Sequence, residues 1–349
     1  MHKENILKKL TTFKNPITIE KFIKLSLYDQ EGYYSSSNVI GSSGDFITSP
    51  EISQLFGEIL GLYILNYWQN NIKKKFNLIE LGPGRGTLLL DIIKITEKFN
   101  NFNEAVSIKL IEKNTNLINK QKTNFNKFNL NLKKIKWHKD FKSNNIDPVI
   151  IIANEFFDCF PIRQFYKKKD IWYEKKIKYN SSEQTLKIKD IKIKNQKTIN
   201  YILSYNPLNT LEISKSREKY FSKICKHILQ VGGMMIAIDY GYLEKPKNFT
   251  LQSIYNNKNS NILDNIGYQD ITSLVDFKSL ISIAKYYNLQ INIFSSQRDF
   301  LIQNGIYERT KKILTSCKTH QKEIIKSGLN RIIDIKNMGT IFKVLVISK

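Results

Sequence analysis

Cysteine and long apolar runs are both scarce in this sequence. Its 349 residues include only three cysteines, Cys159, Cys225 and Cys317. Three cysteines this far apart are too few for a disulfide framework or a zinc site, so we expect reduced thiols and no bound metal. No run approaches the roughly 20 apolar residues of a membrane-spanning helix. We therefore expect no membrane insertion.

Arginine is also rare, although the sequence is strongly basic. The net charge is +24 at pH 7, yet lysine outnumbers arginine 49 to 6. Lysines that bind phosphates should cluster on one face, with arginine and stacking aromatic residues among them. Here they are scattered in short runs such as 73–75 and 167–169. This pattern is typical of an A+T-rich genome, and we do not expect a nucleic-acid partner.

The first residues lack a recognisable targeting signal. The stretch 1–14, MHKENILKKLTTFK, has neither the apolar core of a secretory signal nor the acid-free, arginine-rich composition of a transit peptide. We therefore expect a cytoplasmic protein of a bacterium.

What the sequence does contain is a glycine-rich turn between a strand and a helix. Residues 78–81 form an apolar run suited to a buried strand, and apolar residues return at helical spacing from Thr87. Between them stand three glycines at alternate positions, Gly82, Gly84 and Gly86. Such a turn leaves the N–H groups of the helix start pointing at whatever lies above the strand end. The missing side chains let that ligand approach the backbone closely.

The spacing of the glycines distinguishes between ligands. A phosphate-binding P-loop requires Gly-Lys-Ser/Thr, whereas threonine and leucine follow Gly86. The dinucleotide fingerprint needs its third glycine three places after the second, where Thr87 stands. The pattern Glu80-x-Gly82-x-Gly84-x-Gly86 instead resembles the first motif of the class I S-adenosylmethionine (SAM) methyltransferases. For the loop alone, a structural turn in another α/β protein is the alternative.

Three acidic residues are candidates for binding this cofactor. By the resemblance, Glu80 supports the loop and the amino group of the cofactor. Glu112 directly follows a strand expected at 106–111, and a carboxylate at this place can accept hydrogen bonds from both ribose hydroxyls. The alternative is an exposed glutamate without a role. Asp140 follows a third strand expected at 134–138. In this fold family an acidic side chain there often contacts the adenine amino group.

The fourth expected strand carries the candidate catalytic residues. Residues 149–153 are continuously apolar, as a buried parallel strand requires. Asn154, Glu155 and Asp158 follow at the carboxyl edge, where open α/β sheets bind ligands. By the resemblance to the SAM methyltransferases, the groups that hold the nitrogen to be methylated lie here. If that nitrogen belongs to a guanidinium, a carboxylate pair can hold it bidentately and favour the charge that remains as the methyl group arrives. Glu155 and Asp158 are the candidate pair and Asn154 a secondary group, although Asp158 is alternatively a cap of the turn before Pro161.

The expected elements divide the chain into three parts. Residues 1–70 form an N-terminal loop and helix region, which is either a lid over the cofactor pocket or a brace for the sheet. The core, 71–162 and 206–349, has seven expected strands interleaved with helices, the pattern of a doubly wound, Rossmann-like α/β sheet. Residues 163–205 alternate polar and apolar side chains and predict a β-hairpin insertion on the substrate side.

One further carboxylate follows the fifth expected strand, at 234–238. Asp239 lies at the same edge of the sheet as the candidate pair. It is either a third acidic contact to the methyl acceptor or a carboxylate that stabilises a turn.

Several longer motifs resemble the signatures of one family. They are GDFITSPEISQLFGE (44–58), IELGPGRGTL (79–88), IIANEFFDCFPIRQF (151–165), IDYGY (238–242), TLQS (250–253), DITSLVDF (270–277) and MGTIFKVLVIS (338–348). The chain thereby resembles the MidA-like SAM-dependent methyltransferases over nearly its whole length. One departure is visible, because the family commonly has a histidine after TLQ where this sequence has Asn256 and Asn257.

The resemblance implies a fold, a cofactor and a partner. The fold is the seven-stranded class I sheet with an antiparallel last strand, the cofactor is SAM, and the product is S-adenosyl-L-homocysteine (SAH). Mitochondrial members are complex I assembly factors that methylate arginine. The implied acceptor is an arginine in the large peripheral-arm subunit of a respiratory NADH dehydrogenase, and in a eukaryote the implied location is the mitochondrion.

Two other functions are compatible with the sequence. One is a methyltransferase acting on RNA or a small molecule, which the basic charge favours. The other is a non-catalytic assembly factor that binds SAM without turnover, which the asparagine in place of the family's histidine favours.

Replacing Gly84 by valine tests the assignment of the glycine loop. We expect Gly84→Val to abolish SAM binding, because a β-branched side chain would occupy the space of the methionine moiety. Isothermal calorimetry with SAM measures this loss. Micromolar binding by the variant would contradict the assignment.

Overall fold

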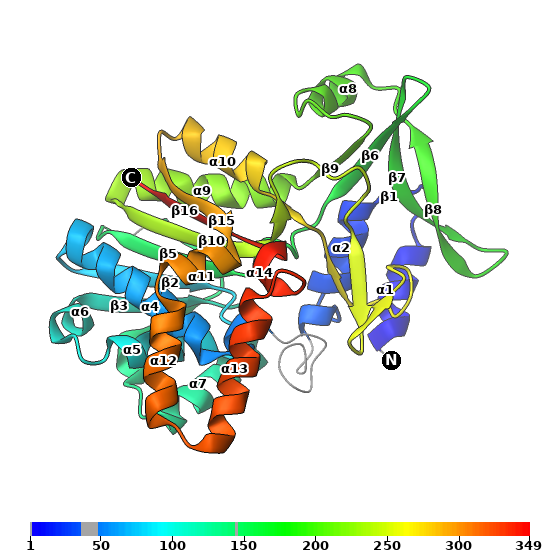
Figure 1. The fold of residues 1–349 in the computed structure, drawn as a ribbon. Coiled ribbons are helices and arrows are strands. Elements are labelled where there is room, and N and C mark those ends of the chain that lie inside the picture. The colour runs from blue at the N-terminus through cyan, green and yellow to red at the C-terminus, as the bar shows by residue number, and fades with distance from the viewer. Residues whose placement is uncertain (1, 36–47, 144–145) are drawn as a thin grey trace.

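Residues 2–35, 48–143 and 146–349 are described by a computed structural model of the chain (Figure 1). Seven strands of these residues form the path of the central sheet, in the order β15-β16-β10-β5-β2-β3-β4. Their bounds are β2 Phe76–Leu81, β3 Val106–Ile111, β4 Ile135–His138, β5 Val149–Asn154, β10 Gly233–Tyr242, β15 Gln290–Ser296 and β16 Phe342–Ser348. The short strand β14, Val275–Asp276, pairs with the end of β10.

The strand directions follow the expected doubly wound pattern. Strands β4, β3, β2, β5 and β10 run parallel to one another. Strand β16 runs antiparallel between β10 and β15. The seven-stranded α/β sheet and the antiparallel last strand are therefore both confirmed.

Helices cover both faces of this sheet, and the apolar residues of the inner strands alternate between two cores. Leu78 and Ile150 contribute to one core with α4, α5, α7 and α11 to α13, whereas Ile79 and Ile151 contribute to the other with α9 and α10 (Figure 1). The bounds are α4 Gln54–Tyr67, α5 Thr87–Thr96, α6 Asn100–Ala105, α7 Thr115–Lys127, α9 Lys215–Val231, α10 Phe277–Tyr286, α11 Gln297–Gln303, α12 Ile306–Ser316, α13 Thr319–Ile333 and α14 Met338–Ile341. Continuously buried strands such as β2 and β5 result, as expected for a sheet covered on both faces.

A second sheet lies beside the core. Its path is β1-β7-β6-β9, with β8 paired to β7. The bounds are β1 Ile17–Thr18, β6 Arg163–Lys168, β7 Ile171–Asn180, β8 Thr185–Lys192 and β9 Thr210–Ile213, and helix α8, Gln196–Leu203, connects β8 to β9. The hairpin expected between 163 and 205 is thus observed as β7 and β8, whose partners include Asn180 and Thr185.

The N-terminal segment joins this second sheet to the core. Helices α1, His2–Thr11, and α2, Ile19–Tyr28, share an apolar cluster with Ile162, Ile177 and Ile271. A 3-10 turn, η1, Tyr33–Ser35, follows α2. The part of the expected lid loop at 36–47, which includes the first four residues of the motif 44–58, lies outside the described residues.

The helical part of the N-terminal region is divided in two, and one strand boundary differs from that expected. Helix α3, Ser49–Ile52, begins at Ser49 and is separated from α4 by extended Ser53. Strand β10 was expected to end at Ile238, but it continues to Tyr242 because β16 pairs with it as far as Tyr240 and β14 pairs with Gly241 and Tyr242. Asp239 therefore lies within a strand and not after it.

Residues 250–276 contain a small sheet. It consists of β11, Gln252–Tyr255, β12, Lys258–Ser260, and β13, Asp270–Thr272. Asn256 and Asn257 connect β11 and β12 with φ angles of 49° and 60°. A two-residue hairpin turn with both residues in the left-handed region favours asparagine, so this hairpin explains the asparagine pair. No helix of the described residues is long and apolar enough to cross a membrane.

Two adjacent glycines allow a test of the strand pairing at the start of β10. Gly232 and Gly233 both have positive φ angles, of 83° and 111°. A Cβ on Gly233 would lie 1.8 Å from the carbonyl oxygen of Val149, whereas one on Gly232 would meet no atom within 4 Å.

We expect Gly232→Ala to cost about 1–3 kcal/mol of backbone strain. Gly233→Ala should cost clearly more, because the clashing oxygen belongs to the backbone of β5. Urea unfolding of the two variants measures the difference. Equal losses of stability would contradict the β5–β10 pairing at this position.

Candidate active site

The glycine loop between β2 and α5 adopts a backbone that other residues disfavour. Gly82, Gly84 and Gly86 have φ angles of 63°, 54° and 81°. A Cβ on Gly86 would also lie 2.6 Å from the ring of Phe125 in α7. The loop is closed by a hydrogen bond of 2.7 Å from the Gly86 N–H to the Pro83 carbonyl. The alternation of glycines thus has a local cause in the turn itself.

Side chains from two helices fix this loop from outside. Gln121 of α7 donates from Nε2 to the Gly84 carbonyl at 2.8 Å. On the other side, Glu51 of α3 accepts a 2.5 Å hydrogen bond from the Thr87 hydroxyl and lies 3.7 Å from the Arg85 guanidinium. We did not predict Glu51 or Gln121 from the sequence, because nothing local to either residue indicates these contacts.

A cavity of about 60 Å³ lies between the loop, α3 and the end of β5. Two oxygen atoms of residues that line it, Glu80 Oε2 and Asn154 Oδ1, are buried and have no hydrogen-bond partner among the described residues. Glu80 is 4% exposed, and burial raises the pKa of its carboxyl from 4.5 to about 8, with the charge of Glu112 as a smaller cause. A ligand that brings N–H donors into this cavity would satisfy both oxygen atoms.

Glu112 and Asp140 follow adjacent strands on the far side of the loop. The Glu112 N–H donates to the His138 carbonyl at 2.9 Å, which places the ends of β3 and β4 together. Glu112 is partly buried, and burial raises its pKa. Asp140 is exposed and forms a 3.1 Å ion pair with Lys113. Glu80, Glu112 and Asp140 thus lie along one edge of the sheet, and their roles toward a cofactor stay predictions.

The end of β5 presents Glu155 in a strained conformation. Its φ angle is 51°, a left-handed value that is unfavourable for a residue with a side chain. Its Oε1 accepts hydrogen bonds of 3.3 Å from the Ser49 N–H and from Asn154 Nδ2. Burial raises the pKa of Glu155 to about 8, and nearby Asp158 contributes to the shift.

Asp239 organises the turn that follows Glu155. Its Oδ2 accepts three backbone hydrogen bonds, from Phe156 at 3.2 Å, Phe157 at 2.8 Å and Asp158 at 3.2 Å. The side chain is fully buried. Of the two roles that the sequence leaves open for Asp239, this geometry favours the carboxylate that stabilises a turn.

Two further residues complete the acidic cluster, which we define as Glu155, Asp158, Asp239 and Asp270. Asp158 is 7% exposed, and burial, then Asp239 and Asp270, raise its pKa well above the ordinary value. Asp270 begins β13 and accepts a 2.8 Å hydrogen bond from the Tyr34 hydroxyl. We did not predict Asp270 as a site residue, although it is the first residue of the motif 270–277.

Arg217 of α9 is a buried cation beside this cluster. It is 5% exposed and donates from Nε to the Phe157 carbonyl at 2.7 Å and from Nη2 to the Ser273 hydroxyl at 3.0 Å. Its charge lowers the pKa values of Asp158 and Asp239 but does not offset burial. When all four carboxyls of the acidic cluster are ionised, the cluster is therefore net negative and favours a cationic ligand.

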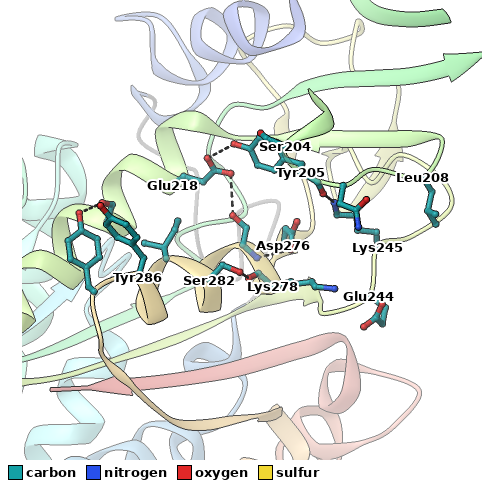
Figure 2. A pocket seen from close by; sticks show the side chains of 15 residues that line it. Ser204, Tyr205, Leu208, Glu218, Glu244, Lys245, Asp276, Lys278, Ser282 and Tyr286 are labelled. Atoms are coloured by element: carbon teal, nitrogen blue, oxygen red, sulfur yellow. Dashed lines mark hydrogen bonds between the residues drawn. The ribbon is translucent and has the colours of Figure 1, made fainter. Parts of the chain in front are cut away.

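A larger cavity lies elsewhere and contains none of the predicted site residues. It has a volume of about 680 Å³ and lies between the turn after α8, α9 and α10 (Figure 2). Its polar groups bond to one another, since Glu218 accepts from the Tyr205 hydroxyl at 2.8 Å and the Ser279 hydroxyl at 3.2 Å. The unsatisfied oxygen atoms lie in the smaller cavity, so we place the chemistry there.

No group of three or more histidine, cysteine, aspartate or glutamate residues in the described part of the chain could hold a metal ion. The three cysteines are free.

Comparison with known proteins identifies the family. The family model described as "Putative S-adenosyl-L-methionine-dependent methyltransferase" matches residues 59–295. The "Protein arginine methyltransferase NDUFAF7 homolog, mitochondrial" of Caenorhabditis elegans is 31% identical, over 98% of this chain and 86% of its own length. The human NDUFAF7 protein is 27% identical, over 94% of this chain and 79% of its own. A crystal structure from Burkholderia thailandensis bound to S-adenosyl-homocysteine has a TM-score of 0.86 at 18% identity, over 100% of this chain and 92% of its own.

The raised pKa of Glu80 predicts how stability depends on pH. The folded protein favours the neutral carboxyl, so this stabilisation is complete below about pH 4.5 and is lost as the pH rises through about 8. Glutamine mimics the neutral form at every pH. We therefore expect Glu80→Gln to raise the unfolding temperature of the ligand-free protein at pH 8, with a much smaller gain at pH 5.

Thermal unfolding at the two pH values measures this effect. Glu97→Gln is the matched control, because Glu97 is exposed and should show no gain. An equal gain for Glu80→Gln at both pH values would contradict burial of an ionisable carboxyl at this position.

Proposed function

The chain belongs to the family of S-adenosyl-L-methionine-dependent methyltransferases, and we propose that it methylates an arginine nitrogen of a protein. The observation that carries the proposal is the acidic cluster beside the glycine loop. Glu155 and Asp158 of this cluster follow β5, and Glu155 lines the same cavity as Glu80, whose Oε2 has no partner among the described residues. Asp239 belongs to β10 and Asp270 to β13.

The residues around the cavity fit the methyl donor of the family. The N–H groups at the start of α5 would bind the carboxylate of the cofactor, and Oε2 of Glu80, which has no partner among the described residues, is suited to its amino group. Glu112 would bind the ribose hydroxyls, and Asp140 the adenine amino group. SAM supplies an activated sulfonium leaving group, so the protein mainly needs to hold the nucleophile close and in line.

Arginine makes specific demands on the remaining residues. Its nitrogen atoms are poor nucleophiles, because the lone pair is delocalised and the group stays cationic at ordinary pH. Glu155 and Asp158 would bind the guanidinium bidentately and orient one nitrogen, with Asn154 accepting a further N–H. As the N–CH3 bond forms and the S–CH3 bond breaks, one N–H proton leaves. Ionised Glu155, with a pKa of about 8, is suited to accept it.

The relatives support the choice of a protein acceptor. Those from worm, fly, frog and mammals are named mitochondrial protein arginine methyltransferases. We propose that the acceptor is the large peripheral-arm subunit of a respiratory NADH dehydrogenase. The location would be the mitochondrion in a eukaryotic host and the cytoplasm in a bacterial one.

The site geometry disfavours the alternative of an RNA acceptor. Acidic residues surround the proposed acceptor position, and they would repel phosphates despite the net charge of +24.

Incubating the purified protein with labelled SAM and either the subunit or total RNA tests the choice of acceptor directly. Methylated arginine in the subunit, identified by mass spectrometry, is the expected result. Labelled RNA with unlabelled protein would overturn the proposal, and binding of SAM without any transfer would indicate a non-catalytic assembly factor.

Glu155→Gln tests the catalytic part of the proposal. We expect unchanged SAM affinity and a turnover number lower by a factor of about 100 or more, because a preorganised electrostatic contact is lost. In the unmodified protein kcat/KM should rise with pH through about 8 as Glu155 ionises, and the variant should lose this rise.

Steady-state kinetics from pH 6 to 9 measure both effects. Glu104→Gln, at an exposed position of α6, is the matched control and should retain full activity. Unchanged turnover in Glu155→Gln would remove Glu155 from the mechanism.

A further inference from the structure

The turn η1 connects the cofactor side of the site to the acceptor side. The main-chain carbonyl of Tyr34 accepts a 2.7 Å hydrogen bond from Asn114 Nδ2. The hydroxyl of the same residue donates a 2.8 Å hydrogen bond to Asp270 Oδ1. One residue of the N-terminal segment thus bonds to two residues, Asn114 and Asp270, that lie 80 and 236 positions away in the sequence.

Asn114 is held firmly on the cofactor side. Its N–H donates to Glu112 Oε1 at 2.9 Å. Its side-chain oxygen caps α7 by accepting from the Asn116 N–H at 2.8 Å. Because Glu112 is the residue proposed to bind the ribose, any ligand that fixes Glu112 also restrains Asn114 and, through it, Tyr34.

Asp270 is the corresponding residue on the acceptor side. It is 6% exposed, and its charge contributes to the raised pKa values of Asp158 and Glu155. It therefore lies close to both carboxylates proposed to hold the guanidinium. The ring of Tyr34 is itself held by neighbours, with its centroid 5.3 Å from that of Tyr33 and 5.5 Å from that of Tyr28.

We propose that Tyr34 is a positioning residue that orients Asp270 toward a guanidinium acceptor and links this orientation to occupancy of the cofactor sugar site. The inference rests on the proposed function, which places the acceptor at the acidic cluster. The links Glu112–Asn114–Tyr34–Asp270 are continuous hydrogen bonds, two of which end on a carboxylate. Hydrogen bonds to charged groups are stronger than neutral ones, so loss of the phenol should have a measurable effect on Asp270.

The coupling can be measured without methyl transfer. The probe is Nα-acetyl-arginine amide, titrated by NMR with and without SAH, and its neutral citrulline analogue is the ligand control. In the unmodified protein we expect SAH to tighten binding of the arginine probe by about tenfold. In Tyr34→Phe this factor should fall to near one, while the affinity for SAH itself stays within twofold. Tyr28→Phe is the matched control, because it removes a phenol that donates to the Cys159 carbonyl and not to Asp270.

A double-mutant cycle shows whether Tyr34 acts through Asp270. Asp270→Asn should weaken probe binding, and adding Tyr34→Phe to it should cause no further loss. A merely structural role for Tyr34 would instead give losses that multiply. Asp264→Asn, an exposed aspartate between β12 and β13, should bind the probe normally.

Three results would overturn the inference. They are failure of the unmodified protein to bind the arginine probe, retention of the SAH effect in Tyr34→Phe, and an equal effect of Tyr28→Phe. If the probe behaves as expected but labelled methyl never reaches arginine, the proposed function fails while the role of Tyr34 stands. If arginine is methylated but Tyr34→Phe keeps the effect of SAH on probe binding, the proposed function stands and the role of Tyr34 fails.

Discussion

The buried carboxylate of Asp239 is the contact on which the proposed acceptor site depends. The three N–H groups that it binds belong to the turn between Glu155 and Asp158. Without it, these groups would be buried at the end of a strand without a partner, each at a cost of about 1–3 kcal/mol. The same three bonds hold the backbone in which Glu155 adopts a positive φ, a conformation that costs about 1–3 kcal/mol. The turn at 156–158 therefore depends on the continuation of β10 past Ile238, because this continuation places the Asp239 side chain within hydrogen-bond distance of the turn.

The electrostatics of the site follow from the same arrangement. Asp158, Asp239 and Asp270 of the acidic cluster are buried, and Glu155 is partly buried. Arg217 is the adjacent cation and donates to the Phe157 carbonyl and the Ser273 hydroxyl. Burial raises the pKa values of Glu155 and Asp158, so the empty site favours neutral carboxyls. A guanidinium that enters the cluster supplies the missing positive charge and favours ionisation. With ionised carboxyls the site binds the proposed acceptor best, but this ionised form is also the one that stabilises the folded protein least. Such a trade-off is expected where binding requires groups that lower stability.

The sequence predicts the framework of this site well, for local reasons. Apolar runs such as 149–153, the alternate glycines and the carboxylates after each strand are patterns within a few residues, and a parallel sheet brings the strand ends to one edge. The positions that the sequence does not indicate depend on long-range contacts. Asp270, Tyr34 and Glu51 reach the site only through tertiary structure. The extension of β10 to Tyr242 depends on pairing with β14 and β16, which both come later in the chain.

The sequence left two alternatives for the N-terminal segment, a lid over the cofactor pocket or a brace for the sheet. The contacts of this segment are compatible with both roles at once. Glu51 bonds to Thr87 at the start of α5, the Ser49 N–H bonds to Glu155, and Tyr34 bonds to Asp270. A pure brace for the sheet would contact the core away from the strand ends, yet all three of these contacts are at the carboxyl edge. Methyl transfer from a sulfonium needs close, in-line approach and a site that excludes water. Segments that line the cavity and also hold its carboxylates would meet both needs, so this part of the chain belongs to the candidate active site as much as the glycine loop does.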